Sequence, residues 1–423
     1  MTPIAIGILA FAALFVALLL RIHIGVAMFL AGSVTFLVVN HGDLNALLFT
    51  INTLGYARLS NYDLAVIPLF ILMGQFATHG GLSRTLFRAA SAFLGHLRGG
   101  LAMAAVGACA GFGAICGSSL ATAATMGQVA LPELRNHGYS GRLATGTLAA
   151  AGTLGILIPP SVPLIIYAVL TQESIGKLFV AAVIPGIIAT LGYFVVIRIL
   201  VAIDPACGPA TAAATFRTRA LALVAVSPVL GIFAVVIIGI YGGWANPTEA
   251  ASIGAAACGL LAVSTGGMRW DGVTRSILGT AEATGMIYLV LLGADLLNSG
   301  LAISQMPVAL ASWVVESGSP SIVVLLTILL TIPIFYPIVM ALNFDGMTAI
   351  DKSIWFGILA LMVVEIGLVH PPLGMNLFII QKLAHDVPYL ETAKGVLPFL
   401  ASDFLRILLL VMVPSLSLWL LRI

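Results

Sequence analysis

The sequence has 423 residues, of which 61% are hydrophobic and only 8% are charged, and its mean hydropathy is +1.14. Soluble domains are about 25% charged, so this composition excludes a soluble fold and predicts an all-α polytopic membrane protein. The formal net charge of +2 excludes nucleic acid as a class of partner. The cysteines match neither a metal site nor a disulfide framework, and they are Cys109, Cys116, Cys207 and Cys258.

Runs of about 20 apolar residues predict the membrane-spanning helices. The first run has no basic residue before it, so we expect a retained helix rather than a signal peptide. Together with two atypical regions, 101–135 and 320–345, these runs predict about 10–12 spans. The clear runs are 3–20, 22–40, 60–79, 143–170, 176–200, 219–241, 246–265, 279–298, 353–380 and 396–421.

Basic residues flank the region 101–135 on both sides. Loops rich in Lys and Arg stay in the cytoplasm, so both ends of this region are expected on the cytoplasmic side. A segment that begins and ends on one side is a re-entrant hairpin. If 44–58 also lies along the membrane interface instead of crossing it, Arg21 falls on the cytoplasmic side and the N-terminus lies outside. The flanking residues are Arg84, Arg88, Arg98, Arg135 and Arg142.

The two halves of the chain carry similar segments. PPSVP begins at Pro159 and PPLGM begins at Pro371, an offset of 212 residues, or half the chain. A second similar pair is 66–84 and 288–305. Because the charge pattern orients the two copies oppositely, the sequence predicts an inverted-topology repeat, which is common in secondary transporters. The predicted parts are a first repeat, 1–203, a cytoplasmic linker, 204–218, and a second repeat, 219–423.

The middle of the predicted hairpin, 112–134, combines glycines with hydroxyl side chains. Glycines let the backbone turn sharply, and non-helical backbone is tolerated at membrane depth only where protein covers it or where it lines a watery cavity. Freed carbonyls and hydroxyls are oxygen ligands suited to a hard cation. A packing face of small residues is the alternative. The hydroxyl residues are Ser118, Ser119, Thr122 and Thr125.

Adjacent prolines interrupt two of the predicted spans, 143–170 and 353–380. Each proline lacks a backbone donor, so the helix is expected to break there, although a simple proline kink is the alternative. The half-helix after each break would point its positive end at an anion, and the carbonyls before the break would face a cation. The prolines are Pro159 and Pro160 in the first span and Pro371 and Pro372 in the second.

Acidic residues inside spans usually mark an ion or substrate path. Glu365, just before the second break, is one candidate, with a carboxylate held by a neighbouring hydroxyl or amide as the alternative. Asp295 is a second candidate. Asp63 and Glu249 lie near the starts of spans, where helix capping is the favoured interpretation.

Five segments resemble the large membrane subunit of tripartite ATP-independent periplasmic (TRAP) transporters: NPTEAASIGA, CGSSLATAATMG, GTLGILIPPSVPLIIYAVLT, TIPIFYPIVMAL and PPLGMNLFI. The likeness covers nearly the whole chain. It implies an elevator-type, inverted-repeat ion transporter that imports organic acids such as C4-dicarboxylates or sialic acids across the bacterial inner membrane with sodium. It also implies two partners, a small four-span membrane subunit and a periplasmic substrate-binding protein, with no enzymatic activity and no cofactor.

The resemblance also assigns roles to residues. The hairpin tip and the first break would bind one sodium ion, and the second break would serve another. The implied ion-binding residues are Gly117, Ser118, Ser119, Gly152, Thr153, Pro159, Pro371 and Asn376. Half-helix N-termini and hydroxyls would meet substrate carboxylates, at Thr122, Ser161, Gly374 and Asn376.

The chain departs from the family pattern in the region 320–345. Family members carry a glycine and an acidic residue at the tip of a second hairpin, and here the sequence runs on without them, so this hairpin is expected to be shortened. Two alternatives to the leading interpretation follow. One is a single-component ion-coupled organic-anion permease of the same architecture, and the other is a degenerate subunit that no longer transports.

Overall fold

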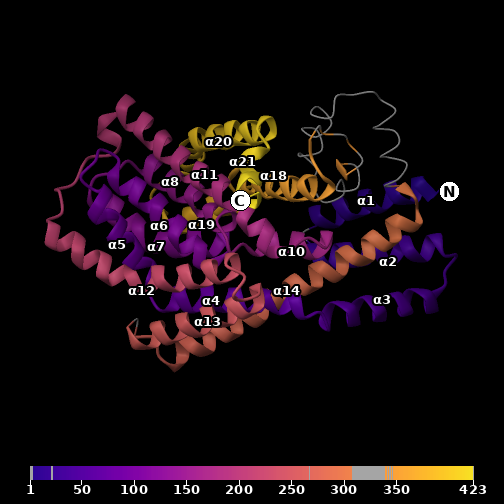
Figure 1. Ribbon diagram of the computed structural model, residues 1–423. Helices are drawn as coiled ribbons and strands as arrows, with labels where there is room; N and C mark the ends of the chain where they lie inside the picture. Colours follow the sequence, from indigo (N-terminus) through magenta and orange to yellow (C-terminus); the bar gives the residue numbers. More distant parts are fainter. Residues whose placement is uncertain are drawn as a thin grey trace. The chain divides into compact units, whose positions relative to one another are not determined.

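The computed structural model describes residues 3–20, 22–265, 267–306, 339, 340, 342, 344 and 346–422. Every regular element in that part of the chain is a helix, as Figure 1 shows, which confirms the all-α prediction. The shortened hairpin predicted at about 320–345 lies almost entirely outside the described residues. All four cysteines are free, as their spacing predicts.

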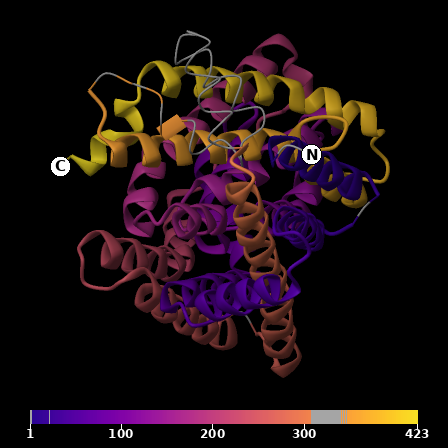
Figure 2. The ribbon, with the colours of Figure 1, turned by 90° about the vertical axis from the view of Figure 1, so that its right-hand side faces the viewer.

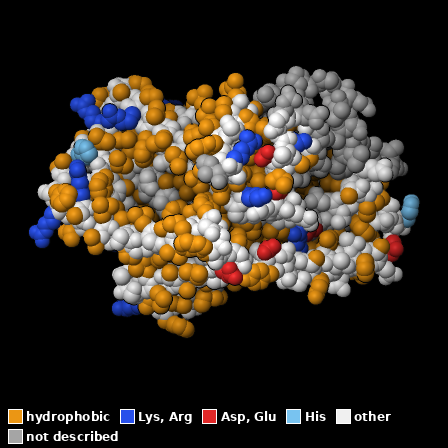
Figure 3. Space-filling model, viewed as in Figure 1, with side chains coloured by type: hydrophobic (Ala, Val, Ile, Leu, Met, Phe, Trp, Pro, Cys, Tyr) orange, Lys and Arg blue, Asp and Glu red, His pale blue; other side chains and the backbone are white. Residues whose placement is uncertain are grey.

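Six described helical segments are long and apolar enough to cross a membrane. A bent pair of helical segments would add a seventh span if it is counted as one. Its first part is α3 (Leu44–Leu59), its second part is η1 (Tyr62–Ala65) continued by α4 (Val66–His79), and the angle between the two parts is 61°. Figure 3 shows hydrophobic side chains over much of the visible face, as a lipid-facing surface requires. The six are Gly141–Thr171, α11 (Ile175–Ile203), α12 (Phe216–Tyr241), α14 (Trp270–Ile303), α18 (Ala349–Val369) and α20 (Tyr389–Met412).

Three further apolar helices are shorter: α1 (Pro3–Leu19), α2 (Ile24–Val39) and α6 (Gly100–Cys116), with 17, 16 and 17 residues. The chain is thus a multi-pass membrane protein, while the full number of 10–12 spans stays a prediction. Predicted spans and helices overlap in place, but some ends differ: α14 begins nine residues before the predicted start at 279, and α20 ends nine residues before the predicted end at 421.

The described chain divides into two compact units, each of which draws on both halves of the sequence. The first comprises Met1–Pro68, Val169–Thr171 and Thr280–Ser353. The second comprises Leu69–Ala168, Gln172–Gly279 and Ile354–Ile423. Because of this interleaving, the unit boundaries differ from the predicted repeats 1–203 and 219–423, and the repeats stay a prediction.

The first unit is held by a close crossing of α2 and α14 through glycines. A Cβ atom on Gly32 would lie 2.5 Å from the Leu297 nitrogen, and one on Gly293 would lie 2.5 Å from the Gly25 carbonyl oxygen. Gly25 and Gly32 are seven residues apart, so they share one helix face. Small residues of this kind let two helix backbones approach within a membrane.

An ion pair links α3 to α14 in the same unit. Arg58 Nε and Nη2 donate to the two carboxylate oxygens of Asp295 at 2.5 and 2.6 Å. This bidentate geometry is the strongest form of the pair. The structure therefore gives Asp295 a structural partner that the sequence analysis did not foresee, since Arg58 lies in a segment expected at the interface.

The second unit contains the hairpin, both broken helices and a layer of long helices around them. Figure 2 shows α18 running beside α20, and Trp355 Nε1 donates to the Leu410 carbonyl at 2.9 Å. Glu249 completes a capping box with Asn246 at the start of α13 (Pro247–Ser264), as predicted. Asn61, rather than Asp63, caps η1 in the first unit, because Asn61 immediately precedes the helix and its side chain accepts from the Asp63 nitrogen at 2.9 Å, whereas Asp63 lies within the first turn.

The predicted linker 204–218 is largely irregular and is tied to the base of the hairpin. It contains η2 (Pro205–Cys207), and α12 begins at Phe216, three residues earlier than predicted. The Gly208 and Cys207 carbonyls accept hydrogen bonds from Gly99 and Ser140, at 2.9 Å each. These bonds connect the linker to the loops that precede and follow the hairpin.

Tyr139 closes the base of the hairpin. Its hydroxyl accepts a hydrogen bond from the Leu101 nitrogen at 3.1 Å, across 38 residues of sequence. Burial raises the pKa of this phenol above its ordinary value, so the hydroxyl stays neutral at physiological pH. The loop therefore holds the hairpin without adding a charge.

Substitution of Gly32 by alanine tests the close crossing of α2 and α14. The added Cβ has no room, so we expect a loss of about 1–3 kcal/mol in stability, typical of overpacking. The matched control is Gly55→Ala in α3, where nothing lies within 4 Å of the added atom. Thermal unfolding in detergent measures both, and equal midpoints for the two variants would contradict the crossing.

Candidate functional site

The predicted hairpin is a pair of helices joined by two residues. Gly117 follows α6 with a φ of +62°, a left-handed conformation that favours glycine. Ser118 is the N-cap of α7 (Ser119–Asn136), and its hydroxyl accepts a hydrogen bond from the Ala121 nitrogen at 3.4 Å. The tip therefore lies at Gly117 and Ser118, where the glycine and hydroxyl pattern indicated it. Re-entry of this hairpin into the membrane stays a prediction.

The first predicted break separates α8 (Gly141–Gly152) and the single turn α9 (Leu154–Leu157) from α10 (Val162–Thr171). The backbone at Ile158 and Ser161 is extended, so the helix stops and restarts, and the simple-kink alternative is wrong here. Ser161 caps α10, with its hydroxyl accepting from the Leu164 nitrogen at 3.5 Å. The second break separates α18 from α19 (Met375–Leu383).

The hairpin tip packs directly on the first break. The Gly117 carbonyl accepts a hydrogen bond from the Val162 nitrogen at 3.4 Å. A Cβ on Gly117 would lie 2.8 Å from the Pro160 oxygen, and one on Gly113 would lie 2.4 Å from the Gly155 Cα. Both approaches are possible only without side chains. The glycines thus explain how the backbone of the broken helix is covered.

Asn376 brings the second broken helix to the same place. Its Nδ2 donates to Ser119 Oγ at 2.8 Å and to the Ala149 carbonyl at 3.1 Å, and Ser119 Oγ donates to Asn376 Oδ1 at 3.1 Å. A Cβ on Gly152 would lie 3.0 Å from Asn376 Nδ2. The structure therefore joins Ser119, Gly152 and Asn376, which the sequence analysis divided between two sodium sites.

This junction, formed by Ser119, Gly152 and Asn376, presents neutral oxygen atoms. The side chains of Ser119 and Asn376 are buried, and they lie against the carboxyl-terminal end of α8, where helix carbonyls lose their intrahelical partners. Hydroxyl, amide and carbonyl oxygens suit a hard monovalent cation better than a transition metal. Among the described residues, no group of three His, Cys, Asp or Glu residues is arranged to hold a metal ion.

The other predicted residues fall around this junction or away from it. Thr122 and Ser161 are fully buried, and Thr122 Oγ1 lies 2.4 Å from the position that a Cβ on Gly155 would take. Pro159 lines the break. Gly374 is the N-cap of α19, and Pro371 precedes it in a turn where the Tyr389 hydroxyl donates to the Pro372 carbonyl at 3.0 Å. The hairpin thus packs against the first break, and Asn376 of α19 connects the second broken helix to both of them.

Thr153 faces a second, charged cluster. Its hydroxyl donates to Glu365 Oε1 at 2.8 Å. The other carboxylate oxygen of Glu365 accepts from Arg406 Nη2 at 2.6 Å, which in turn lies 3.0 Å from Asp403 Oδ1. The Tyr193 hydroxyl donates to Asp403 Oδ2 at 2.9 Å. This charged cluster joins the break to α18, α11 and α20.

All five residues of the charged cluster are buried, and two carboxylates share one guanidinium. Arg406 Nε and Nη1 have no hydrogen-bond partner in the part of the chain that the structure describes. An incompletely satisfied buried ion pair contributes little net stability, so its presence points to a role in fixing geometry. The sequence analysis singled out Glu365 but missed Asp403 and Arg406, although two charges in the apolar run DFLRILLL were a usable signal.

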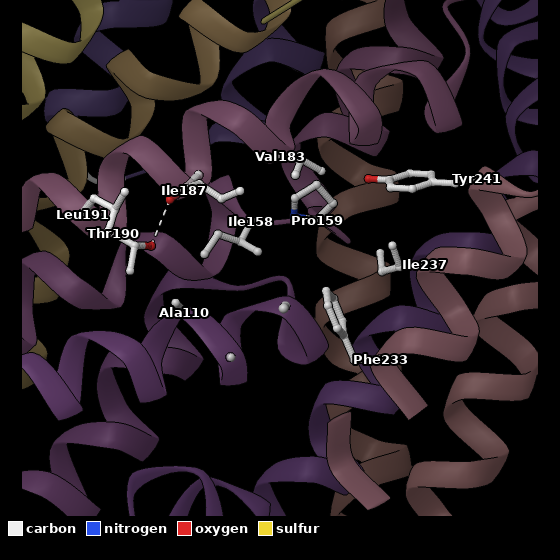
Figure 4. A pocket seen from close by; sticks show the side chains of 13 residues that line it. Ala110, Ile158, Pro159, Val183, Ile187, Thr190, Leu191, Phe233, Ile237 and Tyr241 are labelled. Carbon is white, nitrogen blue, oxygen red and sulfur yellow. Dashed lines mark hydrogen bonds between the residues drawn. The ribbon is translucent and has the colours of Figure 1, made fainter. Parts of the chain in front are cut away.

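An apolar cavity of about 420 Å³ lies beside the first break, and Figure 4 shows the residues that line it. Its lining is almost entirely carbon, so it cannot recognise the carboxylates of an organic acid. The lining residues are Ala110, Gly111, Ala114, Ile158, Pro159, Val183, Gly186, Ile187, Thr190, Leu191, Phe233, Ile237 and Tyr241.

Comparison with known proteins gives consistent results. The family model described as "Tripartite ATP-independent periplasmic transporter, DctM component" matches residues 11–416. The chain is 35% identical over 409 residues to the C4-dicarboxylate TRAP transporter large permease protein DctM of Pseudomonas aeruginosa, covering 92% of each chain. It is 28% identical to the sialic acid TRAP transporter large permease protein SiaM of Vibrio cholerae, covering 85% of this chain and 86% of that protein.

Solved structures also share the fold. The crystal structure of the Alcanivorax borkumensis YdaH transporter, described as having an unusual topology, superposes with a TM-score of 0.54. The match covers 90% of this chain and 89% of that chain at 16% sequence identity. At this identity the likeness concerns the fold alone.

Replacement of Arg406 by methionine tests the charged cluster. The change leaves Glu365 and Asp403 buried without their cation, so we expect a loss of about 3–5 kcal/mol in stability. Thermal unfolding in detergent measures the loss. The matched control is Arg275→Met, because Arg275 pairs with Asp271 on an exposed helix surface and should matter little.

A triple variant separates charge from packing at the same cluster. When Arg406→Met is combined with Glu365→Gln and Asp403→Asn, no unpaired charge remains, and most of the lost stability should return. A triple variant as unstable as Arg406→Met alone would show that packing, rather than charge, sets the loss.

Proposed function

Because this chain belongs to the DctM family of TRAP transporter large permeases, we propose that it forms the transport path of a sodium-coupled importer of an organic acid. Members of the family are transport proteins, so the chain is not an enzyme. The substrate class that we propose is a C4-dicarboxylate, a sialic acid or a related carboxylate. The proposed location is the bacterial inner membrane.

The observation that carries the sodium proposal is the junction of Ser119, Gly152 and Asn376. Three separate segments supply it, namely the hairpin and the two broken helices. A cation bound to their oxygens would hold these segments together, and its loss would release them. Because the binding energy would order the hairpin tip, substrate affinity would depend on the ion.

Substrate carboxylates would be bound through helix ends rather than through basic side chains. Ser161 and Gly374 are the N-caps of α10 and α19. At α10 the Val162 N–H donates to the Gly117 carbonyl and the Leu164 N–H to the Ser161 hydroxyl, so a carboxylate would replace these acceptors. Thr122 would add a hydroxyl. Since Thr122 and Ser161 are fully buried here, substrate entry requires the hairpin and the broken helices to separate.

The partners that we propose follow from the family. They are a small four-span membrane subunit and a periplasmic substrate-binding protein, which would deliver the organic acid. Selection of the substrate would then lie mainly in the soluble protein, and the large permease would need only general carboxylate chemistry at its helix ends.

Substitution of Ser119 by alanine tests the sodium junction. Loss of one oxygen ligand and its hydrogen bonds, worth about 1 kcal/mol, should raise the half-saturating sodium concentration about fivefold. The measurement is the rise in thermal unfolding midpoint with NaCl, at ionic strength held constant with choline chloride. The matched control is Ser264→Ala in α13, where the hydroxyl is exposed and donates only to its own helix.

The same variants should then be reconstituted with the small subunit and the binding protein. Uptake by Ser119→Ala should need more sodium than uptake by the wild type or by Ser264→Ala. Unchanged sodium dependence in both assays would remove the junction from ion coupling. Sodium-independent uptake by the wild type would refute the sodium-coupled function itself.

A further inference from the structure

The apolar cavity beside the first break has features that organic-acid transport does not use. It lies within the second unit, among α6, the Ile158–Pro159 segment, α11 and α12. The Thr190 hydroxyl is not available to a ligand, because it donates to the Gly186 carbonyl of its own helix at 2.9 Å, as the dashed line in Figure 4 shows. The lining is therefore almost entirely apolar, and the Tyr241 hydroxyl, which Figure 4 shows turned toward Pro159, is a polar group at one end of it.

The cavity opens on a surface that faces lipid. The helices α11 and α12 both meet the length and hydropathy of membrane spans. Ile187 and Leu191, which line the cavity, are each 54% exposed, and Ile238 of α12 is exposed beside it. In a membrane, apolar side chains in such positions contact acyl chains, so lipid is the medium that has access to the cavity.

One end of the cavity lies at the level expected for lipid headgroups. Tyr241 ends α12 and lines the cavity, and Trp244 follows it with 81% of its surface exposed. Tyr and Trp concentrate at membrane–water interfaces. The start of α11 lies near the same end of α12, because a Cβ on Gly176 would lie 3.6 Å from Ile240 Cγ2, and the exposed Lys177 follows Gly176 in the sequence. An ammonium group there complements a phosphate.

We propose that this cavity binds one acyl chain of a membrane phospholipid, with the phosphate at Lys177 and the chain running along α11 and α12 to Ile158. From Phe233 to Tyr241 the wall of α12 is about 12 Å long, at 1.5 Å per residue, so the cavity takes a substantial part of a chain. The bound chain packs on Ile158 and Pro159, the backbone that the helix break leaves without a regular hydrogen-bond pattern. The lipid is thus a structural ligand of the break.

A photoreactive phospholipid tests this binding directly. The full transporter is reconstituted in bilayers that contain a small fraction of phospholipid with a diazirine in the middle of one acyl chain. After irradiation, mass spectrometry should find the label concentrated on Ile158, on 183–191 and on 233–241. Labelling spread evenly over the exposed faces of α11 and α12 would overturn the proposal.

Variants that fill the cavity supply the second arm of the test. Ala110→Phe places a ring in the cavity and should lower the labelling at least fivefold, and the smaller Ala110→Val should lower it partly, even if the larger variant folds poorly. The control Ala225→Phe makes the same change at an exposed position of α12 outside the lining and should not alter labelling. Unchanged labelling in both Ala110 variants would overturn the site.

The assembled transporter distinguishes a lipid from a protein occupant. If the small membrane subunit fills the cavity, labelling will appear only when the large permease is purified alone and will vanish in the complex, which would overturn the proposal. Sodium-dependent stabilisation is measured in parallel, so failure of the lipid site and failure of the sodium junction remain separate results.

Discussion

A membrane protein must satisfy every backbone polar group within its own structure, because lipid offers neither donors nor acceptors. The two helix breaks in this chain work against that constraint, since each exposes carbonyls and N–H groups in the middle of a span. The hairpin α6–α7 satisfies this constraint in part at the first break, where the Gly117 carbonyl accepts a hydrogen bond from the Val162 nitrogen. Because Gly113 and Gly117 carry no side chain, the hairpin backbone can lie directly against the backbone of the break. Because the hairpin is a separate segment, it covers the break through a hydrogen bond and close glycine contacts rather than through the intrahelical bonds of the broken helix itself.

The charged cluster adjoins the junction, because Thr153 of the cluster follows Gly152 of the junction in the sequence, but the chemistry of the two sites is opposite. At the junction, neutral oxygens gather at the end of α8, while in the cluster two carboxylates share one guanidinium. If the neutral set binds the proposed cation, it can also lose it without leaving a charge unpaired, whereas the charged set must stay paired. A transporter needs both behaviours, one segment that changes its contacts and one that holds the scaffold for that change.

The sequence predicted the features that depend on local chemistry. Paired prolines located both breaks, and the glycine and hydroxyl pattern located the hairpin tip at Gly117 and Ser118, because these residues restrict the backbone wherever they occur. The resemblance to a known family supplied the functional class. The capping of α13 by Asn246 and Glu249 was equally local and was equally predictable.

What the sequence did not reveal are contacts between distant segments. Nothing in the local pattern around Asn376 indicates that it meets Ser119, 257 residues away, and the pairing of Arg58 with Asp295 spans 237 residues. Such partners depend on the arrangement of helices, which hydropathy does not specify. The charges of α20 were visible in the sequence, but their partner Glu365 became evident only from the packing of α18.

Thr153 and Glu365 have one more property in common. They are 212 residues apart, the same offset that relates Pro159 to Pro371, so they are equivalent positions if the chain is a duplication, and their side chains are hydrogen-bonded to each other. In a two-fold arrangement only residues on the symmetry axis meet their own counterparts. The axis of the second unit would then pass beside a buried carboxylate, and the hydrogen bond to it links the two broken helices directly to each other. A movement that parted these two helices would leave that carboxylate without one of its donors.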